Sequence, residues 1–210
     1  MDKLSENLLL QKIKSLYYEK KLSTREVAEE LNISRWRVIH LMRKNNLKLR
    51  NYKEANLVRF LKSAKSFKPK SRLSLLDQKL KIAGIMLYWA EGAKRNPNRR
   101  WYTLDFANSN PEMIKLFLKF LREICGVSEE KLRVYLYCFD NQDIEELKRY
   151  WSRVTNIPSK QFLKPYIRKS LSSHANNKMP YGLVHIRYCD KRLFMLIEKW
   201  IKEYLRELNI

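Results

Sequence analysis

The sequence predicts an α+β fold, with a small all-helical domain followed by a domain whose helices pack on one face of a mostly antiparallel sheet. Residues 6–50 have the apolar period of amphipathic helices. Residues 132–139 alternate between apolar and polar side chains, as a half-buried strand does. From residue 75 onward, segments typical of helices and of strands follow one another. The expected domains are residues 1–52, a basic linker at 53–74, and residues 75–210.

The composition indicates a polyanionic partner. The chain has 210 residues, with 44 Lys and Arg against 22 Asp and Glu, which gives a formal net charge of +22. DNA or RNA is the usual partner of such a chain, and a ribosome or an anionic membrane surface is the alternative. No apolar run is long enough to span a bilayer, and residues 1–15 lack the apolar core of a signal peptide.

The cysteine pattern favours a reducing compartment. Cys125, Cys138 and Cys189 are odd in number and widely spaced, so we expect reduced thiols and not disulfides or zinc ligands. The expected location is the cytoplasm, with nucleoid association if the source is prokaryotic.

The first domain has the start and stop signals of consecutive short helices. Ser23 and Glu26 form a predicted capping box at the start of a second helix. Asn32 occupies a turn that requires the left-handed conformation, and Ser34 is expected to cap a third helix over residues 35–44. The spacing of these features with the apolar residues around them resembles the helix-turn-helix pattern.

The third helix is therefore predicted to be a DNA recognition helix. Arginine side chains can read guanine through two hydrogen bonds, and residues near the start of the helix reach the base edges first. A protein-docking module is the alternative, and Trp36 could pack on its own domain or on the phosphate backbone. The predicted DNA-binding positions are Arg35, Trp36, Arg37, His40 and Arg43.

The linker is strongly basic. Between Arg43 and Arg72 there are eleven basic residues and one acidic residue, Glu54. Residues 52–66 are compatible with a helix, and the rest should be extended because of Pro69. We expect Lys62 and Lys65 to follow DNA phosphates, which would add affinity that falls with salt. The alternative is a solvated charged surface.

The second domain is predicted to contain helices at residues 75–92, 111–125, 141–155 and 191–208, with strands at 101–109, 132–139, 161–169 and 182–189. Alternation along three of these strands places basic and aromatic side chains on one sheet face. Such a face suits the major groove of a duplex, whereas a plain solvent-facing sheet is the alternative. The predicted DNA-binding residues on this face are Arg133, Tyr135, Tyr137, Lys164, Tyr166, Arg168, His185 and Arg187.

An apolar helical run, IAGIMLYWAEGAK at residues 82–94, ends abruptly in Glu91-Gly92. An acidic residue at the end of a buried helix is costly unless it has a role. One interpretation is a carboxylate that holds a metal ion near nucleic acid, and the other is a structural cap or hydrogen-bond partner.

The segment LYWAEG at residues 87–92 resembles the second half of the LAGLIDADG motif of homing endonucleases. Several later segments match in order, including FANSNPEMIKLFLKFLREICGV, YWSRVTNIPSKQF and YGLVHIRYCDKRLFMLIEKWI. The resemblance implies a Mg²⁺-dependent endonuclease acting on double-stranded DNA. It assigns Glu91 and Lys94 to catalysis and Glu91 and Gly92 to the metal site, with Lys164 or Arg187 as alternative phosphate contacts. Because one motif is present, it also implies a homodimer through the helix at residues 82–92.

The chain departs from this family in ways that leave a second interpretation open. Ala83, Gly84, Ala90 and Gly92 would allow close helix packing, but Met86, Tyr88 and Trp89 are bulky, and the acid is Glu where the family usually has Asp. A DNA-binding regulator without cleavage activity, or an RNA-binding protein, is therefore the alternative.

The remaining titratable residues give weaker signals. His174 lies in a loop at residues 170–178 that could contact phosphate. Asp105, Asp140 and Asp143 could form an acidic cluster, but Asp140 and Asp143 are better explained as a helix cap.

Overall fold

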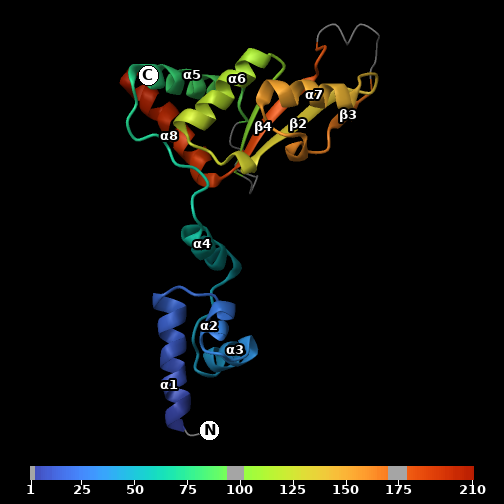
Figure 1. Cartoon of the computed structure of the whole chain (residues 1–210). Coiled ribbons are helices and arrows are strands. Elements are labelled where there is room, and N and C mark those ends of the chain that lie inside the picture. Colours follow the sequence, from blue (N-terminus) through green and yellow to red (C-terminus); the bar gives the residue numbers. More distant parts are fainter. Residues whose placement is uncertain (1–2, 94–101, 170–178) are drawn as a thin grey trace. The chain divides into compact units, whose positions relative to one another are not determined.

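The computed structural model describes residues 3–93, 102–169 and 179–210 (Figure 1). The chain divides into two compact units, Met1–Ala64 and Lys65–Ile210. The first unit is helical and the second combines helices with a sheet of four strands, so the predicted α+β class is confirmed. The first unit extends through a helix that the sequence had placed in the linker.

The first unit consists of a small core formed by three helices and of a fourth helix that follows them. Their bounds are Lys3–Lys14 (α1), which continues into a π-helical turn at Ser15–Glu19, Thr24–Glu30 (α2), Arg35–Lys44 (α3) and Tyr52–Lys62 (α4). The buried core side chains are Ile13, Leu16, Tyr17, Val27, Ala28, Val38, Leu41 and Met42. They come from the first three helices and the turn, so α4 lies outside this core.

The predicted caps of α2 and α3 are confirmed. The Ser23 hydroxyl accepts from the backbone N–H of Glu26, and the Glu26 carboxylate accepts from the backbone N–H of Ser23. Asn32 has a φ of 50°, which asparagine tolerates better than most side chains. Ser34 caps α3 by accepting from the N–H of Arg37. These local signals fix the turn between the two helices.

Across its described residues, the second unit has four α-helices, with π-helical or 3₁₀ turns in the connections after α6 and α7. The helices are Leu75–Glu91 (α5), Pro111–Lys119 (α6, continued by a π-helical turn at Phe120–Ile124), Ile144–Thr155 (α7) and Lys191–Glu207 (α8). The strands are Thr103–Asn108 (β1), Leu132–Phe139 (β2), Tyr166–Arg168 (β3) and Leu183–Cys189 (β4). Short 3₁₀ turns occupy Glu129–Lys131 and Ser159–Gln161.

The sheet has the strand order β1-β4-β2-β3. β4 pairs antiparallel with β1 and with β2, whereas β2 and β3 are parallel. Inward-facing side chains of β1, β2 and β4 form one core with α5, α6, α7 and α8. In Figure 1, α5, α6 and α8 are grouped together and α7 lies beside β2 and β3. The opposite sheet face is left to polar and aromatic side chains.

Two predicted elements are shorter than expected. The strand predicted at 161–169 is reduced to β3, because Gln161 ends a 3₁₀ turn and Pro165 has no N–H to donate to a ladder. The helix predicted from residue 141 begins at Ile144, because Asp143 caps it by accepting from the N–H groups of Glu145 and Glu146. The predicted cap role of Asp143 is thus confirmed, and Trp101, the predicted start of β1, lies outside the described residues.

Residues 65–74, predicted as the end of a linker, belong to the second unit. Phe67 is buried and forms a bridge with Val127. The N–H of Lys68 donates to the carbonyl of Gly126, which has a φ of 61° and whose added Cβ would lie 2.1 Å from the Lys68 carbonyl oxygen. A basic segment without periodicity gave no indication of this attachment, since it depends on partners more than fifty residues away.

Lys70 and Asp77 fasten this segment to the start of α5. Both carboxylate oxygens of Asp77 lie within 2.9 Å of Lys70 Nζ, and one also accepts from the N–H and hydroxyl of Ser74. The hydrogen bond from Lys70, followed by those from Ser74, lowers the pKa of Asp77 to about 2. The ionised carboxylate is therefore favoured by folding.

Acid should weaken this attachment in a defined pH window. Because the folded-state pKa of Asp77 lies below its usual value of about 4, its stabilisation is complete above about pH 4 and is lost as pH falls toward about 2. Urea unfolding of the wild type and of Asp77→Asn at pH 5 and pH 2.5 tests this. The variant should lose less of its unfolding free energy between the two pH values. An equal loss would contradict the assignment.

Candidate nucleic-acid interface

Helix α3 presents most of the predicted reading residues to solvent. Arg35, Trp36, His40 and Arg43 are exposed, while Arg37 is half-buried and makes further contacts. Trp36 is 71% exposed and its ring stacks on His40 with centroids 4.9 Å apart. It therefore does not pack into the core of its own unit. A large exposed aromatic pair beside arginine is the kind of surface that meets a partner.

Arg35 differs from its neighbours on α3. Its Nε donates to the hydroxyl of Thr24 at 3.2 Å, which turns the side chain toward the start of α2. Together with Ile39, it lines a pocket in the first unit. Arg35 is thus at the edge of the exposed α3 surface, whereas Trp36, His40 and Arg43 follow one another along it.

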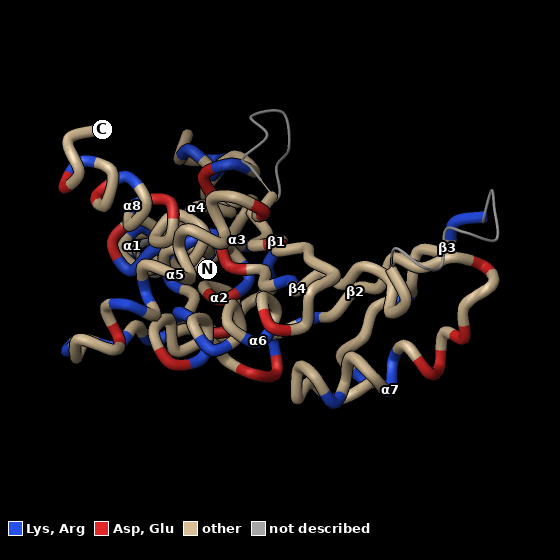
Figure 2. The backbone as a smooth tube through the Cα atoms, turned by 90° about the horizontal axis from the view of Figure 1, so that it is seen from above, with Lys and Arg blue, Asp and Glu red and all other residues tan. Residues whose placement is uncertain are grey.

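The basic residues after α3 do not form one uniform surface. The guanidinium of Arg50 donates to the carbonyls of Tyr17, Lys21 and Leu22 and lies 4.0 Å above the Tyr17 ring. Arg50 therefore holds the chain after α3 against the bundle. Lys62 lines the same pocket as Arg35, and Lys65 is exposed at the start of the second unit. Figure 2 shows Lys and Arg along many elements, interrupted by Asp and Glu on α7 and α8.

The strand register brings predicted residues from β2 and β4 together. Arg133 pairs with Arg187, and Tyr135 pairs with His185. The guanidinium of Arg187 lies 4.4 Å over the Tyr135 ring, whose centroid is 5.5 Å from that of His185. All four side chains are half-buried. Tyr135, His185 and Arg187 form one compact group, called the central cluster, on the sheet face opposite the core, and the Arg133 guanidinium beside it donates to the carbonyls of Glu130 and Leu132.

The remaining predicted sheet residues lie toward the β3 edge. Tyr137 and Tyr166 pair across β2 and β3 and their rings stack at 4.8 Å. Arg168 is exposed at the end of β3, opposite Phe139. Lys164 is exposed and precedes β3, so the predicted strand does not extend to it.

Asp105 on β1 organises the central cluster, a role that the sequence analysis missed. One carboxylate oxygen lies 2.8 Å from Nδ1 of His185 and the other lies 2.7 Å from Nε of Arg187. Burial raises the pKa of Asp105, but the hydrogen bonds and charges of His185 and Arg187 outweigh it and hold the pKa below its usual value. The polar position of Asp105 within a strand was visible in the sequence, but its partners are eighty residues away.

Glu91 is the last residue of α5 and is exposed. Within the described parts of the chain its carboxylate has no hydrogen-bond or ion-pair partner. This observation gives no support to a structural cap, and a negative charge is unfavourable at a helix C-terminus. The chain then turns onto β1, where the N–H of Ala93 donates to the carbonyl of Asp105 at 2.8 Å. The end of α5 therefore lies beside β1, next to the backbone of Asp105.

The described residues do not supply a complete set of metal ligands. Residues 3–93, 102–169 and 179–210 contain no group of three or more His, Cys, Asp or Glu side chains placed to hold a metal ion. Both oxygens of Asp105 are already engaged by His185 and Arg187, whereas Glu91 is exposed at the end of α5. Mg²⁺ is commonly bound by one or two carboxylates with phosphate and water. Lys94, the second predicted catalytic residue, and His174 lie outside the described residues.

Two of the four small residues in and after α5, Gly84 and Gly92, pack against side chains of their own unit. A Cβ on Gly84 would lie 2.1 Å from Cγ of Phe120, and one on Gly92 would lie 2.4 Å from the Tyr88 ring. Both glycines therefore meet side chains of their own unit, and the homodimer through this helix stays a prediction. The outer side of α5 instead shows Leu75, Ile82 and Trp89, spaced by seven residues and 69%, 37% and 46% exposed.

Among the described residues, none of the helices is both long enough and apolar enough to cross a membrane. Comparisons with protein-family models, curated proteins and solved structures found no match. The resemblance to LAGLIDADG proteins therefore stays a prediction, and the placement of the side chains carries the functional argument.

Proposed function

We propose that this protein binds double-stranded DNA with α3, used as the recognition helix of a helix-turn-helix, and with the polar face of a LAGLIDADG-like sheet. The observation that carries the proposal is the central cluster on that face, where Asp105 holds His185 and Arg187 beside Arg133 and Tyr135. Side chains that are already held in place lose little conformational freedom when they contact phosphate. The net charge of +22 supplies the long-range attraction. Such a protein would act in the cytoplasm or nucleoid.

The proposed activity is Mg²⁺-dependent hydrolysis of a phosphodiester bond in each strand. Glu91 would hold Mg²⁺, which when bound activates water and neutralises charge on the leaving oxygen. His185 and Arg187, fixed by Asp105, would orient the phosphate next to the end of α5. Because the described residues of one chain contain no complete group of metal ligands, two chains would be needed, associated through the exposed Leu75, Ile82 and Trp89 side of α5.

A DNA-binding regulator that does not cut is the second candidate. It is favoured because both oxygens of Asp105 are already engaged and the described residues contain no group of three metal-ligating side chains. In this case the central cluster would contact phosphates, and no phosphodiester bond would be hydrolysed. Both candidates require duplex binding, and they differ only in the fate of the DNA.

Selection from a randomised duplex library, with Mg²⁺ and separately with Ca²⁺, tests both candidates. We expect a sequence motif among the bound molecules, and cut ends with Mg²⁺ only if the endonuclease is correct. A variant with Trp36→Ala and His40→Ala should lose the motif, because both side chains are exposed and its core is untouched. Absence of any enriched motif, or stronger displacement by RNA than by duplex, would overturn the DNA proposal.

A further inference from the structure

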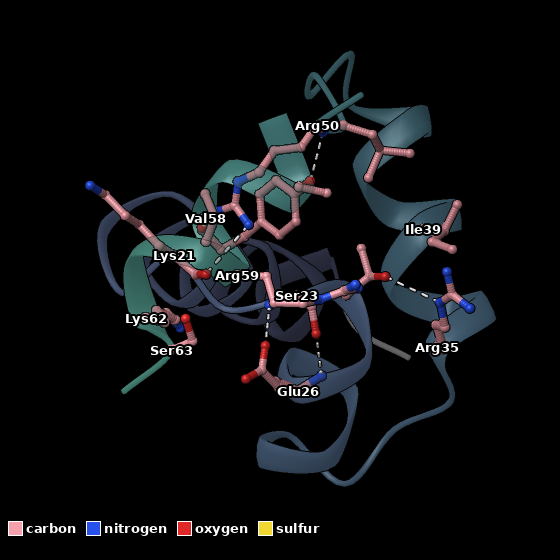
Figure 3. A pocket seen from close by; sticks show the side chains of 14 residues that line it. Lys21, Ser23, Glu26, Arg35, Ile39, Arg50, Val58, Arg59, Lys62 and Ser63 are labelled. Carbon is pink, nitrogen blue, oxygen red and sulfur yellow. Dashed lines mark hydrogen bonds between the residues drawn. The ribbon is translucent and has the colours of Figure 1, made fainter. Parts of the chain in front are cut away.

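The first unit contains a pocket that the sequence did not indicate. Its volume is about 610 Å³, within the range of small-molecule sites. It lies among the start of α2, helix α3 and helix α4, and Figure 3 shows the lining side chains. Its charged lining residues are Lys21, Glu26, Arg35, Arg50, Arg59 and Lys62. All of them belong to the first unit, so the pocket is complete within it.

The charge of this lining is strongly unbalanced. Five of its side chains are basic and one, Glu26, is acidic. The Glu26 carboxylate already accepts from the N–H of Ser23, and that hydrogen bond, with the added charges of Lys62 and Arg50, keeps the pKa of Glu26 below its usual value. The acid is thus ionised and occupied by the α2 cap, and it neutralises a small part of the basic charge.

Three of the basic side chains remain available for a ligand. Within the described residues, the side chains of Lys21, Arg59 and Lys62 have no hydrogen bond or ion pair. The Arg50 guanidinium already donates to backbone carbonyls. Nε of Arg35 donates to the Thr24 hydroxyl, while the terminal nitrogens of Arg35 have no described partner. Grouping like charges around a hollow costs electrostatic energy, which a bound anion would relieve.

Most of the remaining lining is apolar or aromatic. The side chains of Tyr17, Ile39, Leu49, Ala55 and Val58 form this surface, and the hydroxyl side chains of Ser23, Thr24 and Ser63 complete the pocket. A bare anion would leave this surface without contacts. A phosphate carried on an organic body matches both parts, since the phosphate meets the cations and the body covers the apolar wall.

We propose that this pocket is a binding site for a phosphate group carried on an organic body. The phosphate has two chemical sources, the sugar-phosphate backbone of DNA or a free nucleotide-like molecule. The DNA source rests on the proposed function, whereas the free-ligand source does not. Arg35 opens α3 and also lines the pocket, so a free phosphate ester held there would compete with DNA for the same side chain.

Binding of adenosine monophosphate to the full chain, measured by calorimetry at low salt, tests the free source. The pocket variant carries Arg59→Gln and Lys62→Gln. The control carries Lys12→Gln and Lys53→Gln, which removes the same charge from exposed positions of α1 and α4 that do not line the pocket. We expect the pocket variant to bind the nucleotide at least about tenfold more weakly, and the control to match the wild type.

Duplex binding across a salt series by the same three proteins tests the DNA source. If DNA phosphate occupies the pocket, the pocket variant should flatten the slope of log affinity against log salt by about one to two, since each lost phosphate contact removes about 0.9. The control should flatten it less. Nucleotide binding without any duplex binding would retain the pocket but overturn the proposed function. If the two double variants behave alike in both assays, the pocket is not a phosphate site.

Discussion

Replacing Glu91 with Gln should abolish Mg²⁺-dependent cutting while duplex affinity stays within about twofold. Loss of a residue from a catalytic unit typically lowers the rate by a factor on the order of 10³ or more. Gln keeps the size of the side chain but cannot offer a charged ligand, and Glu91 has no described partner whose loss would disturb the fold. Removing a negative charge from the end of α5 should if anything stabilise the helix. Single-turnover cutting assays and binding titrations separate the two effects.

Glu207→Gln is a matched control for this variant. Glu207 is exposed and is also the last residue of a helix of 17 residues, α8, just as Glu91 is the last residue of α5. It should leave both cutting and binding unchanged. If cutting survives in Glu91→Gln, Glu91 is not the metal ligand. If binding falls as much as cutting, the carboxylate has a structural role that its exposure does not indicate.

The features predicted correctly depend on neighbours in the chain. The caps at Ser23, Ser34 and Asp143 and the left-handed turn at Asn32 are set by residues within three positions, so sequence spacing is sufficient. Strand alternation likewise placed Tyr135 on the polar face of the sheet.

The features missed depend on distant partners. The sequence did not reveal that Asp105 holds His185 and Arg187, that Arg50 closes back on Tyr17, or that residues 65–74 attach to the second unit. A Lys or Arg in a basic segment gives the same sequence pattern whether its side chain faces solvent, DNA or a carboxylate. The candidate site was therefore predictable as a sheet face, but its internal ion pairs were not.

Replacing Gly84 with Val should destabilise the second unit by about 3 kcal/mol or more, at the upper end of the usual cost of overpacking. The first added carbon alone would lie 2.1 Å from Cγ of Phe120, which is fully buried. The Phe120 ring cannot simply withdraw, because Phe117 and Trp200 lie against it with ring centroids 5.9 and 6.3 Å away. Relief requires α5 to move away from the π-helical turn Phe120–Ile124. Hydrogen exchange should show lost protection in α5, α6 and β1 but not in α2 and α3, which have a separate core.

Ala83→Val on the same helix is the control, because Ala83 is half-buried and a branched side chain there should cost about 1 kcal/mol or less. The comparison also bears on the homodimer. If Gly84→Val is no less stable than Ala83→Val but dissociates a dimer seen by light scattering, then Gly84 faces a partner helix, as the LAGLIDADG resemblance implies. If Gly84→Val instead unfolds the second unit, the glycine is needed inside it. Association through α5 would then depend on its outer side, where Leu75, Ile82 and Trp89 are exposed.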